Sequence, residues 1–239
     1  MSPRYKLASK DTPPARALNV HFPPAPLDAN LANVITDGGP GSWKQEAFWD
    51  EYVVEFRNSG ERPLEIASVS LVDFAGTSRS AGVDPWALER ESKTLEVKFR
   101  DSGMAFARIA APRVLVASAE PVAVASVGIG TAGAAVAASV TAVALPVYGL
   151  AIWSTNRHRK SAIEAEFNRH RLTLPLSIAP GETRTGSLFF PMVPNPRSLD
   201  LNWSNGSGTR DSVLPLDFLH GLHVAAAPAD SMTPRTASP

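Results

Sequence analysis

The residues whose types could carry chemistry are few, and their spacing completes no known metal-binding pattern. The chain has five histidines, and only His220 and His223 lie close together. Histidines three residues apart can share a metal ion on a helix. However, Gly221 and the Ala/Pro-rich tail disfavour a helix here, and no third ligand follows. We therefore expect no metal site and no bound cofactor.

Acidic and nucleophilic side chains also form no catalytic pattern. Asp50 with Glu51, and Glu89 with Glu91, form local acidic pairs that we expect to be exposed. Such pairs lack the apolar surroundings that turn a carboxyl group into a general acid. The chain has no cysteine, no G-x-S-x-G nucleophile turn and no phosphate-binding loop. We therefore predict that the protein is not an enzyme. A cleft gathering Asp217, His220 and His223 is the observation that would revive an enzymatic function.

Charge and length narrow the possible partners. The 239 residues include 23 Lys+Arg and 23 Asp+Glu, so the formal net charge is zero. A nucleic-acid-binding protein typically shows a basic surface, so we expect no nucleic-acid partner. No small-molecule substrate is indicated either. The length fits one domain, or one domain with a large insertion.

Alternating apolar residues predict about seven short strands with turns between most of them, which is typical of a β-sandwich. In the run from Leu64 to Phe74 the alternation slips between Ile66 and Val69, which indicates a bulge or a break. No strand alternates with a helix as in a doubly wound sheet. The other alternating runs are Tyr52–Phe56, Leu95–Phe99, Leu172–Ile178, Arg184–Phe190, Leu199–Trp203 and Val213–Phe218.

Two of these regions resemble a known class of module. The string Tyr-Val-Val-Glu-Phe-Arg-Asn-Ser-Gly at 52–60, with Arg-Pro-Leu-Glu-Ile at 62–66, is similar to a hairpin of bacterial immunoglobulin-like envelope modules of the lipoprotein type. The strings at 176–182 and 186–191 resemble a later hairpin of the same modules. The resemblance implies an immunoglobulin-like β-sandwich with a non-enzymatic scaffold role.

The expected fold class is mainly β with a helical insertion (α+β), an immunoglobulin-like sandwich that carries an Ala/Gly-rich helical hairpin. We divide the chain into an extended Pro-rich arm (1–45), a first part of the sandwich (46–100), a helical apolar insertion (101–171), a second part of the sandwich (172–220) and a disordered tail (221–239).

The insertion contains an unusual apolar segment. The 36 residues 121–156 carry no charge, whereas a membrane-spanning helix needs about 20 mainly apolar residues. Small residues recur at helical spacing in two parallel rows, which gives a flat helix face that another backbone can approach closely. We predict that these rows make the membrane or oligomer contact: Ser126, Gly130, Ala134, Ala138 and Ala142, beside Gly133, Ala137 and Thr141.

The end of this segment is typical of a membrane interface. Tyr148 and Trp153 are followed by the basic residues Arg157, Arg159 and Lys160. Aromatic rings favour the headgroup level, and cations favour lipid phosphates. We therefore add the two aromatics to the membrane contact and assign the three cations to lipid headgroups. Beyond Trp153 we expect a helix that continues to about Arg171.

Topology constrains how the segment meets a bilayer. If strands on both of its sides belong to one sandwich, both ends lie on the same side of the membrane. We therefore expect a helical hairpin, with arms at 104–127 and 134–153, whose Ala/Gly tip enters the bilayer. Arg108, Arg113 and Glu120 disfavour two full spans.

These observations predict a non-enzymatic, membrane-associated protein of the bacterial cell envelope that acts as a scaffold and forms a homo-oligomer. The chain carries no secretory signal at its start, so an envelope location implies that a signal or a lipid-bearing residue is missing from it. Two alternatives remain open, a pore-forming or membrane-damaging effector and a soluble β-sandwich that binds or adheres. A hairpin buried in the free protein, together with leakage of dye from liposomes, would favour the effector, and full solubility without detergent would favour the soluble module.

Overall fold

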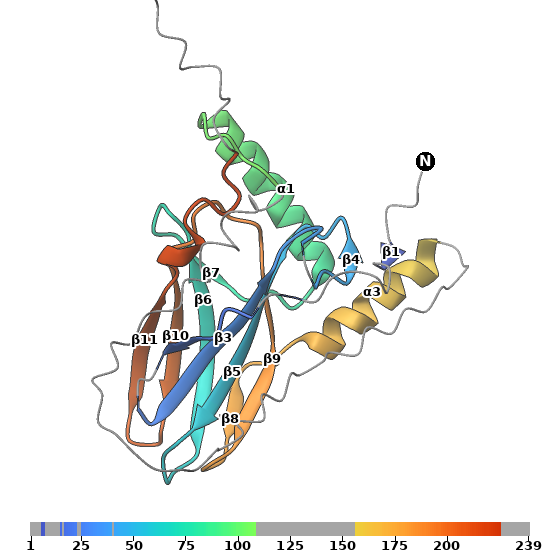
Figure 1. Ribbon diagram of the computed structural model, residues 1–239. Coiled ribbons are helices and arrows are strands. Elements are labelled where there is room, and N and C mark those ends of the chain that lie inside the picture. The colour runs from blue at the N-terminus through green and yellow to red at the C-terminus, as the bar shows by residue number, and fades with distance from the viewer. Residues whose placement is uncertain are drawn as a thin grey trace, which may run out of the picture.

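The structure, a computed structural model, describes residues 6–7, 15, 17–22, 25–39, 41–108 and 156–225. Within this part the chain is mainly β, with two main antiparallel sheets and two α-helices (Figure 1). A mainly β fold was the coarse expectation from the alternating runs, and it is confirmed.

The first sheet has four strands in the order β2–β3–β5–β9. Strand β5 lies inside it and pairs with β3 on one side and β9 on the other. The β5–β9 pairing runs from Asp50 opposite Phe190 to Arg57 opposite Thr183. The strands are β2 (Val20–Phe22), β3 (Leu27–Ile35), β5 (Asp50–Asn58) and β9 (Thr183–Phe190).

The second sheet has five strands, in the order β11–β10–β6–β7, with β8 also paired to β6. They are β6 (Leu64–Val72), β7 (Ser78–Ser80), β8 (Leu176–Ile178), β10 (Ser198–Ser204) and β11 (Thr209–Pro215). A short pair joins β1 (Lys6–Leu7) to β4 (Lys44–Gln45), and the 3₁₀-helix η1 (Asp217–Leu219) follows β11.

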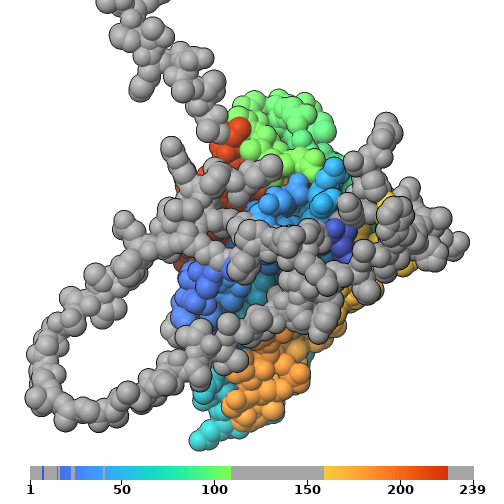
Figure 2. Space-filling model, turned by 45° about the vertical axis from the view of Figure 1, so that its right-hand side comes forward, coloured from blue at the N-terminus to red at the C-terminus, as the bar shows by residue number. Residues whose placement is uncertain are grey.

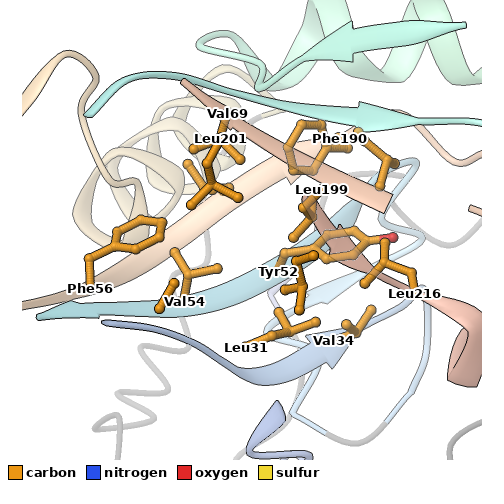
Figure 3. Close-up of a cluster of buried hydrophobic side chains, with 14 of the residues drawn as sticks. Leu31, Val34, Tyr52, Val54, Phe56, Val69, Phe190, Leu199, Leu201 and Leu216 are labelled. Atoms are coloured by element: carbon orange, nitrogen blue, oxygen red, sulfur yellow. The ribbon is translucent and has the colours of Figure 1, made fainter. Parts of the chain in front are cut away.

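The hydrophobic core lies between the two sheets. Alternate residues of a strand point to opposite faces, so each sheet contributes one row of apolar side chains. Figure 3 shows these side chains pointing toward one another from both sheets, with Leu216 closing one end of the cluster. The rows include Leu31, Tyr52, Val54, Phe56 and Phe190 from the first sheet and Val69, Leu199 and Leu201 from the second.

The expected slip in β6 is a β-bulge. Trp203 of β10 pairs with Ile66, and the residue before it, Asn202, pairs with Ser68. Ala67 is therefore the extra residue. The bulge keeps Ile66 and Val69 on the same buried face although three positions separate them. A bulge of this kind re-aims side chains without ending the strand.

The strand expected at Leu95–Phe99 is wrong, because these residues lie in helix α1 (Pro85–Asp101). Leu88, Leu95 and Phe99 are buried at helical spacing, whereas Val97 is 54% exposed. Asp84 accepts a hydrogen bond from the backbone N–H of Trp86, and Pro85 occupies the first turn. Such a capped, proline-initiated start is a helix signal that outweighs three alternating residues.

The boundaries expected for the arm and the tail are also wrong in part. Strand β3 lies inside the segment assigned to an arm, and its Leu27 and Leu31 are fully buried. Leu222 and His223 lie inside the segment assigned to a disordered tail, and both are fully buried. Apolar side chains in both places help to fill the core.

Helix α3 (Asn156–His170) packs beside β9 on the outer face of the first sheet (Figure 1). Its Ile163 and Phe167 are fully buried, and Phe167 stacks on Phe189 with ring centroids 4.1 Å apart. The expectation of a helix ending near Arg171 is confirmed. Residues 104–108, expected to begin the first hairpin arm, are not helical, and Phe106 instead forms an isolated bridge with Val224. Residues 109–155 lie outside the described part.

Candidate functional site at Asp50 and Glu51

Two consecutive carboxylates at the start of β5 organise the polar interior of the molecule. Asp50 is 0% exposed and Glu51 is 2% exposed. The expectation that this acidic pair is exposed is therefore wrong, and so is the same expectation for Glu89, which is 5% exposed. Because neighbouring residues of a strand point to opposite faces, the two carboxylates meet different parts of the chain.

Asp50 pairs with His223 at one end of the core. The imidazole Nε2 of His223 lies 2.8 Å from one carboxylate oxygen of Asp50 and 3.0 Å from the other. Its Nδ1 lies 3.0 Å from the backbone carbonyl oxygen of Ala107. The C-terminal segment therefore lies against the residues that follow α1, and Figure 2 shows these red and green parts in contact.

Glu51 pairs with His170 on the outer face of the sheet. The Nδ1 of His170 lies 3.0 Å from Oε1 of Glu51, and its Nε2 lies 3.2 Å from Oε1 of Glu166. The hydroxyl of Ser187 donates to Oε1 of Glu51 at 2.5 Å, and the indole of Trp43 donates to Oε2 at 2.7 Å. Glu51 therefore joins the end of α3 to β5, β9 and the loop before β5.

Both histidines have a raised pKa. Burial alone would lower the pKa of His223, but the Asp50 carboxylate and the backbone hydrogen bonds outweigh burial and raise it. Burial likewise opposes protonation of His170, and the carboxylates of Glu51 and Glu166 outweigh burial and raise its pKa. Opposite charge thus dominates over desolvation at both rings.

A buried lysine lies in an aromatic cluster next to Glu51. The ammonium of Lys44 lies 4.3 Å from the ring centre of Trp49, with Phe48 and Trp86 at 6.0 and 5.9 Å. It donates to the backbone carbonyl of Glu46 at 2.9 Å. Burial lowers the pKa of Lys44 to about 8, against the opposing effect of nearby carboxylates.

A lysine with a lowered pKa can act as a nucleophile, but the described cavity next to Lys44 is small. The adjoining cavity, lined by residues that include Thr36, Trp43 and Glu51, measures about 10 Å³. That volume fits one water molecule. The geometry supports a structural role for this cluster.

The hydroxyl of Ser187 is also not arranged for attack. It donates to Glu51 and not to an imidazole, so the nucleophile–base contact of a catalytic triad is missing here. Among the described residues, no group of three or more His, Asp or Glu side chains is arranged to hold a metal ion. Of the histidine pair in the sequence, His223 is buried against Asp50 whereas His220 is exposed.

Most residues predicted for membrane contact lie outside the described part of the chain. These are Ser126, Gly130, Gly133, Ala134, Ala137, Ala138, Thr141, Ala142, Tyr148 and Trp153. Arg157 lies in the first turn of α3, and Arg159 is half-buried. The ammonium of Lys160 lies 5.1 Å from the ring centre of Trp86 on α1. No helix within the described ranges is both long and apolar enough to span a bilayer.

Sequence reasoning missed Asp50, Glu51 and His170 as a polar centre. The available signal was an Asp-Glu pair placed directly after the apolar run Ala47-Phe48-Trp49 at the start of a strand. Charged residues are almost never fully buried unless they are paired, so such a position implies partners elsewhere in the chain.

No family model and no curated protein matches this chain. Among solved structures, it is similar to a 2.2 Å crystal structure of a conserved hypothetical protein from Bacillus anthracis. The two chains are 12% identical with a TM-score of 0.29, and the match covers 85% of this chain and 99% of the other. Similarity at this level carries no information about function.

Proposed function

We propose that this protein is a non-enzymatic, membrane-associated scaffold of the bacterial cell envelope. In this proposal the described part is an immunoglobulin-like sandwich that carries the apolar segment 121–156. That segment contacts the bilayer as a hairpin, and its small-residue rows associate with those of other copies.

The observation that carries the proposal is the pairing of strands from both sides of the segment. Strand β5 pairs with β9, and β6 pairs with both β8 and β10. The chain therefore leaves and returns to a single folded unit. A segment of 36 uncharged residues that starts and ends on the same side of a bilayer must cross an even number of times or dip into it.

The polar interior supports a scaffold rather than an enzyme. The Asp50–His223 and Glu51–His170 contacts join elements that are far apart in the sequence. The described cavity beside Glu51 measures about 10 Å³, which fits one water molecule. These groups serve as links between elements within the described ranges.

Membrane association is tested by washing membranes with alkaline carbonate. The full chain is expected to stay in the pellet, and a variant lacking 121–153 is expected to move to the supernatant as a folded protein. A variant lacking 226–239 is the matched control and is expected to stay in the pellet. Release of the full chain as a stable soluble species would reject the membrane role and favour the soluble binding module.

Self-association is tested separately through the small-residue rows. The substitution Ala137→Leu places a large side chain on a row, and it is expected to reduce the oligomer to a smaller species in detergent. The control Val140→Leu enlarges a residue of the same segment that belongs to neither row, and it is expected to leave the size of the oligomer unchanged. Equal sizes for all three proteins would reject oligomer formation through these rows.

A further inference from the structure

Asp50 and Glu51 each hold a histidine that is linked to a part of the chain next to residues 109–155. His223, paired with Asp50, also binds the backbone carbonyl of Ala107, just before that segment. His170, paired with Glu51, is the last residue of α3, the helix that follows it. One dipeptide of β5 therefore holds, through these histidines, the residues just before the segment and the far end of the helix that follows it, one on each face of the sheet.

The hydrogen bonding of His223 requires two ring protons. In His223, Nδ1 faces the carbonyl oxygen of Ala107 at 3.0 Å, and Nε2 faces the carboxylate of Asp50 at 2.8 Å. Both partners only accept hydrogen bonds. A neutral imidazole has one N–H, so it would leave one of them facing a lone pair. The imidazolium form satisfies both.

At His170 the protonated form is favoured by the nearby carboxylates, although Arg169 could donate to Nε2 of a neutral ring. Its Nδ1 and Nε2 lie 3.0 and 3.2 Å from carboxylate oxygens of Glu51 and Glu166. The guanidinium of Arg169 lies 3.1 Å from the same Nε2 and opposes protonation, but it is also paired with Glu166. The carboxylates of Glu51 and Glu166 therefore face two groups that can carry a positive charge, the ring of His170 and the guanidinium of Arg169. Ser187 and Trp43, from β9 and the loop before β5, add only donors to Glu51.

The charged group that faces the ring of His223 is the carboxylate of Asp50. Tyr52 lies next along the same face of β5, and its hydroxyl is neutral because burial and Asp50 raise its pKa well above the usual value. Arg108 contributes its backbone to the ring, while its guanidinium pairs with Asp37 at 3.1 Å. The raised pKa of each histidine agrees with the hydrogen-bond geometry.

We propose that Asp50 and Glu51 form a double clasp, in which two protonated histidines fix both flanks of residues 109–155 to β5 and both attachments weaken as the pH rises. The link to a membrane rests on the proposed function, since the clasp borders the segment proposed to enter the bilayer. The clasp itself depends only on the described residues.

The direction of the pH effect on stability follows from the raised pKa of both histidines. The stabilisation is fully present below the unfolded-state pKa of about 6.5 and is lost as the pH rises through the folded-state pKa. Each pH unit between the two pKa values changes the opening equilibrium by about tenfold. Opening of α3 and of residues 104–108 is therefore expected to increase with pH over that window.

The test is nuclear magnetic resonance of the full chain in detergent micelles, with isotope-labelled histidine. Near pH 6 we expect both ring nitrogens of His170 and His223 to show imidazolium shifts. On titration to about pH 9 both rings are expected to lose their proton above about pH 6.5, the usual value for a free imidazole. Hydrogen exchange of α3 amides, corrected for its intrinsic pH dependence, is expected to rise over the same range, while exchange in β10 stays constant.

Variants assign the signals and supply the control. His170→Gln is expected to abolish the pH dependence of α3 exchange, whereas His220→Gln leaves it unchanged. If His223→Gln fails to fold, the signal of His223 is assigned by elimination from variants of the other histidines. Neutral rings at pH 6, loss of the ring protons at or below about pH 6.5, or pH-independent exchange of α3 would each overturn the clasp.

These readouts contain no lipid-binding step. A failed clasp in a protein that resists carbonate rejects only the clasp. An intact clasp in a protein that washes off membranes rejects only the membrane role.

Discussion

Tyr52 places a hydroxyl group in the core of the molecule. The residue is 0% exposed, and among the described residues its oxygen has no hydrogen-bond partner. Its ring meets Phe190 edge-on, with centroids 5.4 Å apart. The ring therefore stabilises the core while the hydroxyl is desolvated without compensation.

We predict that Tyr52→Phe leaves the free energy of unfolding unchanged or raises it by up to about 1 kcal/mol, because it removes an unsatisfied buried donor. Chemical denaturation measures the change. Tyr52→Ala is the matched comparison, and it is expected to lower the same free energy by about 3 to 5 kcal/mol through loss of the ring. Clear destabilisation by Tyr52→Phe would mean that the hydroxyl has a partner.

Lys44 gives a prediction with the opposite pH dependence to the histidines. Burial lowers its pKa from 10.5 to about 8, so between these values the unfolded chain binds a proton that the folded chain has lost. Stability from this residue therefore rises with pH in that window, by at most about 1.4 kcal/mol per pH unit. In Lys44→Met this rise is expected to disappear. Denaturation curves of both proteins from about pH 7 to pH 10 measure the difference, and parallel curves would contradict the lowered pKa.

Residue-scale chemistry was the least predictable part of the molecule. The ring of His170 binds Glu51 across 119 positions, and His223 binds Asp50 across 173. No local pattern links residues so far apart. Their burial arises only when the sheets and helices assemble, so an Asp-Glu pair that the sequence presents as a surface feature becomes the polar centre of the fold.

At the scale of elements, alternation predicted strands well where one face is buried and the other polar. Strand β10, with Leu199, Leu201 and Trp203 buried between half-buried residues, follows this rule. The turn after β5 was predicted from its residues, but the hairpin expected there is wrong, because β5 and β6 lie in different sheets and do not pair. Asn58 stabilises the turn by donating to the carbonyls of Arg62 and Ile178.

The rule failed where local composition misled. Leu95, Val97 and Phe99 alternate, but Leu88, Leu95 and Phe99 also share one face of a helix. Strand β3 was missed although Leu27, Ala29 and Leu31 alternate with Asp28 and Asn30, because the prolines that precede it favoured an extended arm. In both cases the sequence is compatible with two local structures, and tertiary packing decides between them.

The capping of α1 supplies a prediction at this scale. Asp84 accepts from the backbone N–H of Trp86 at 2.9 Å and so satisfies one free donor of the first turn. Asp84→Ala is expected to lower the free energy of unfolding by about 1 kcal/mol, and Asp84→Asn, which keeps an acceptor, by only a small fraction of that. Thermal or chemical denaturation measures both. Equal losses for the two variants would assign the effect to charge, since Arg90 lies 3.9 Å from the Asp84 carboxylate.

The whole molecule is built from two halves of the chain that complete each other. The first sheet takes β2, β3 and β5 from before residue 109 and β9 from after residue 155. The second takes β6 and β7 from the first half and β8, β10 and β11 from the second. The shared core contains apolar residues of both halves, including Tyr52, Ile66, Phe190 and Trp203.

Neither half should therefore fold without the other. We predict that a chain cut within 121–153, at an introduced protease site, keeps its two fragments together and unfolds in one cooperative transition. The reason is that β5–β9 and β6–β10 pairing, with the core between them, does not depend on the covalent link. Co-elution of the fragments in detergent without denaturant, and their separation with denaturant, measures this association.

The fragment 1–120 expressed alone is expected to lack stable structure, because β5 and β6 then expose both apolar surface and unpaired backbone edges. If that fragment alone gave a cooperative unfolding transition, the chain would contain two independent units. The two ends of the apolar segment would then lead into different folded units and not into one.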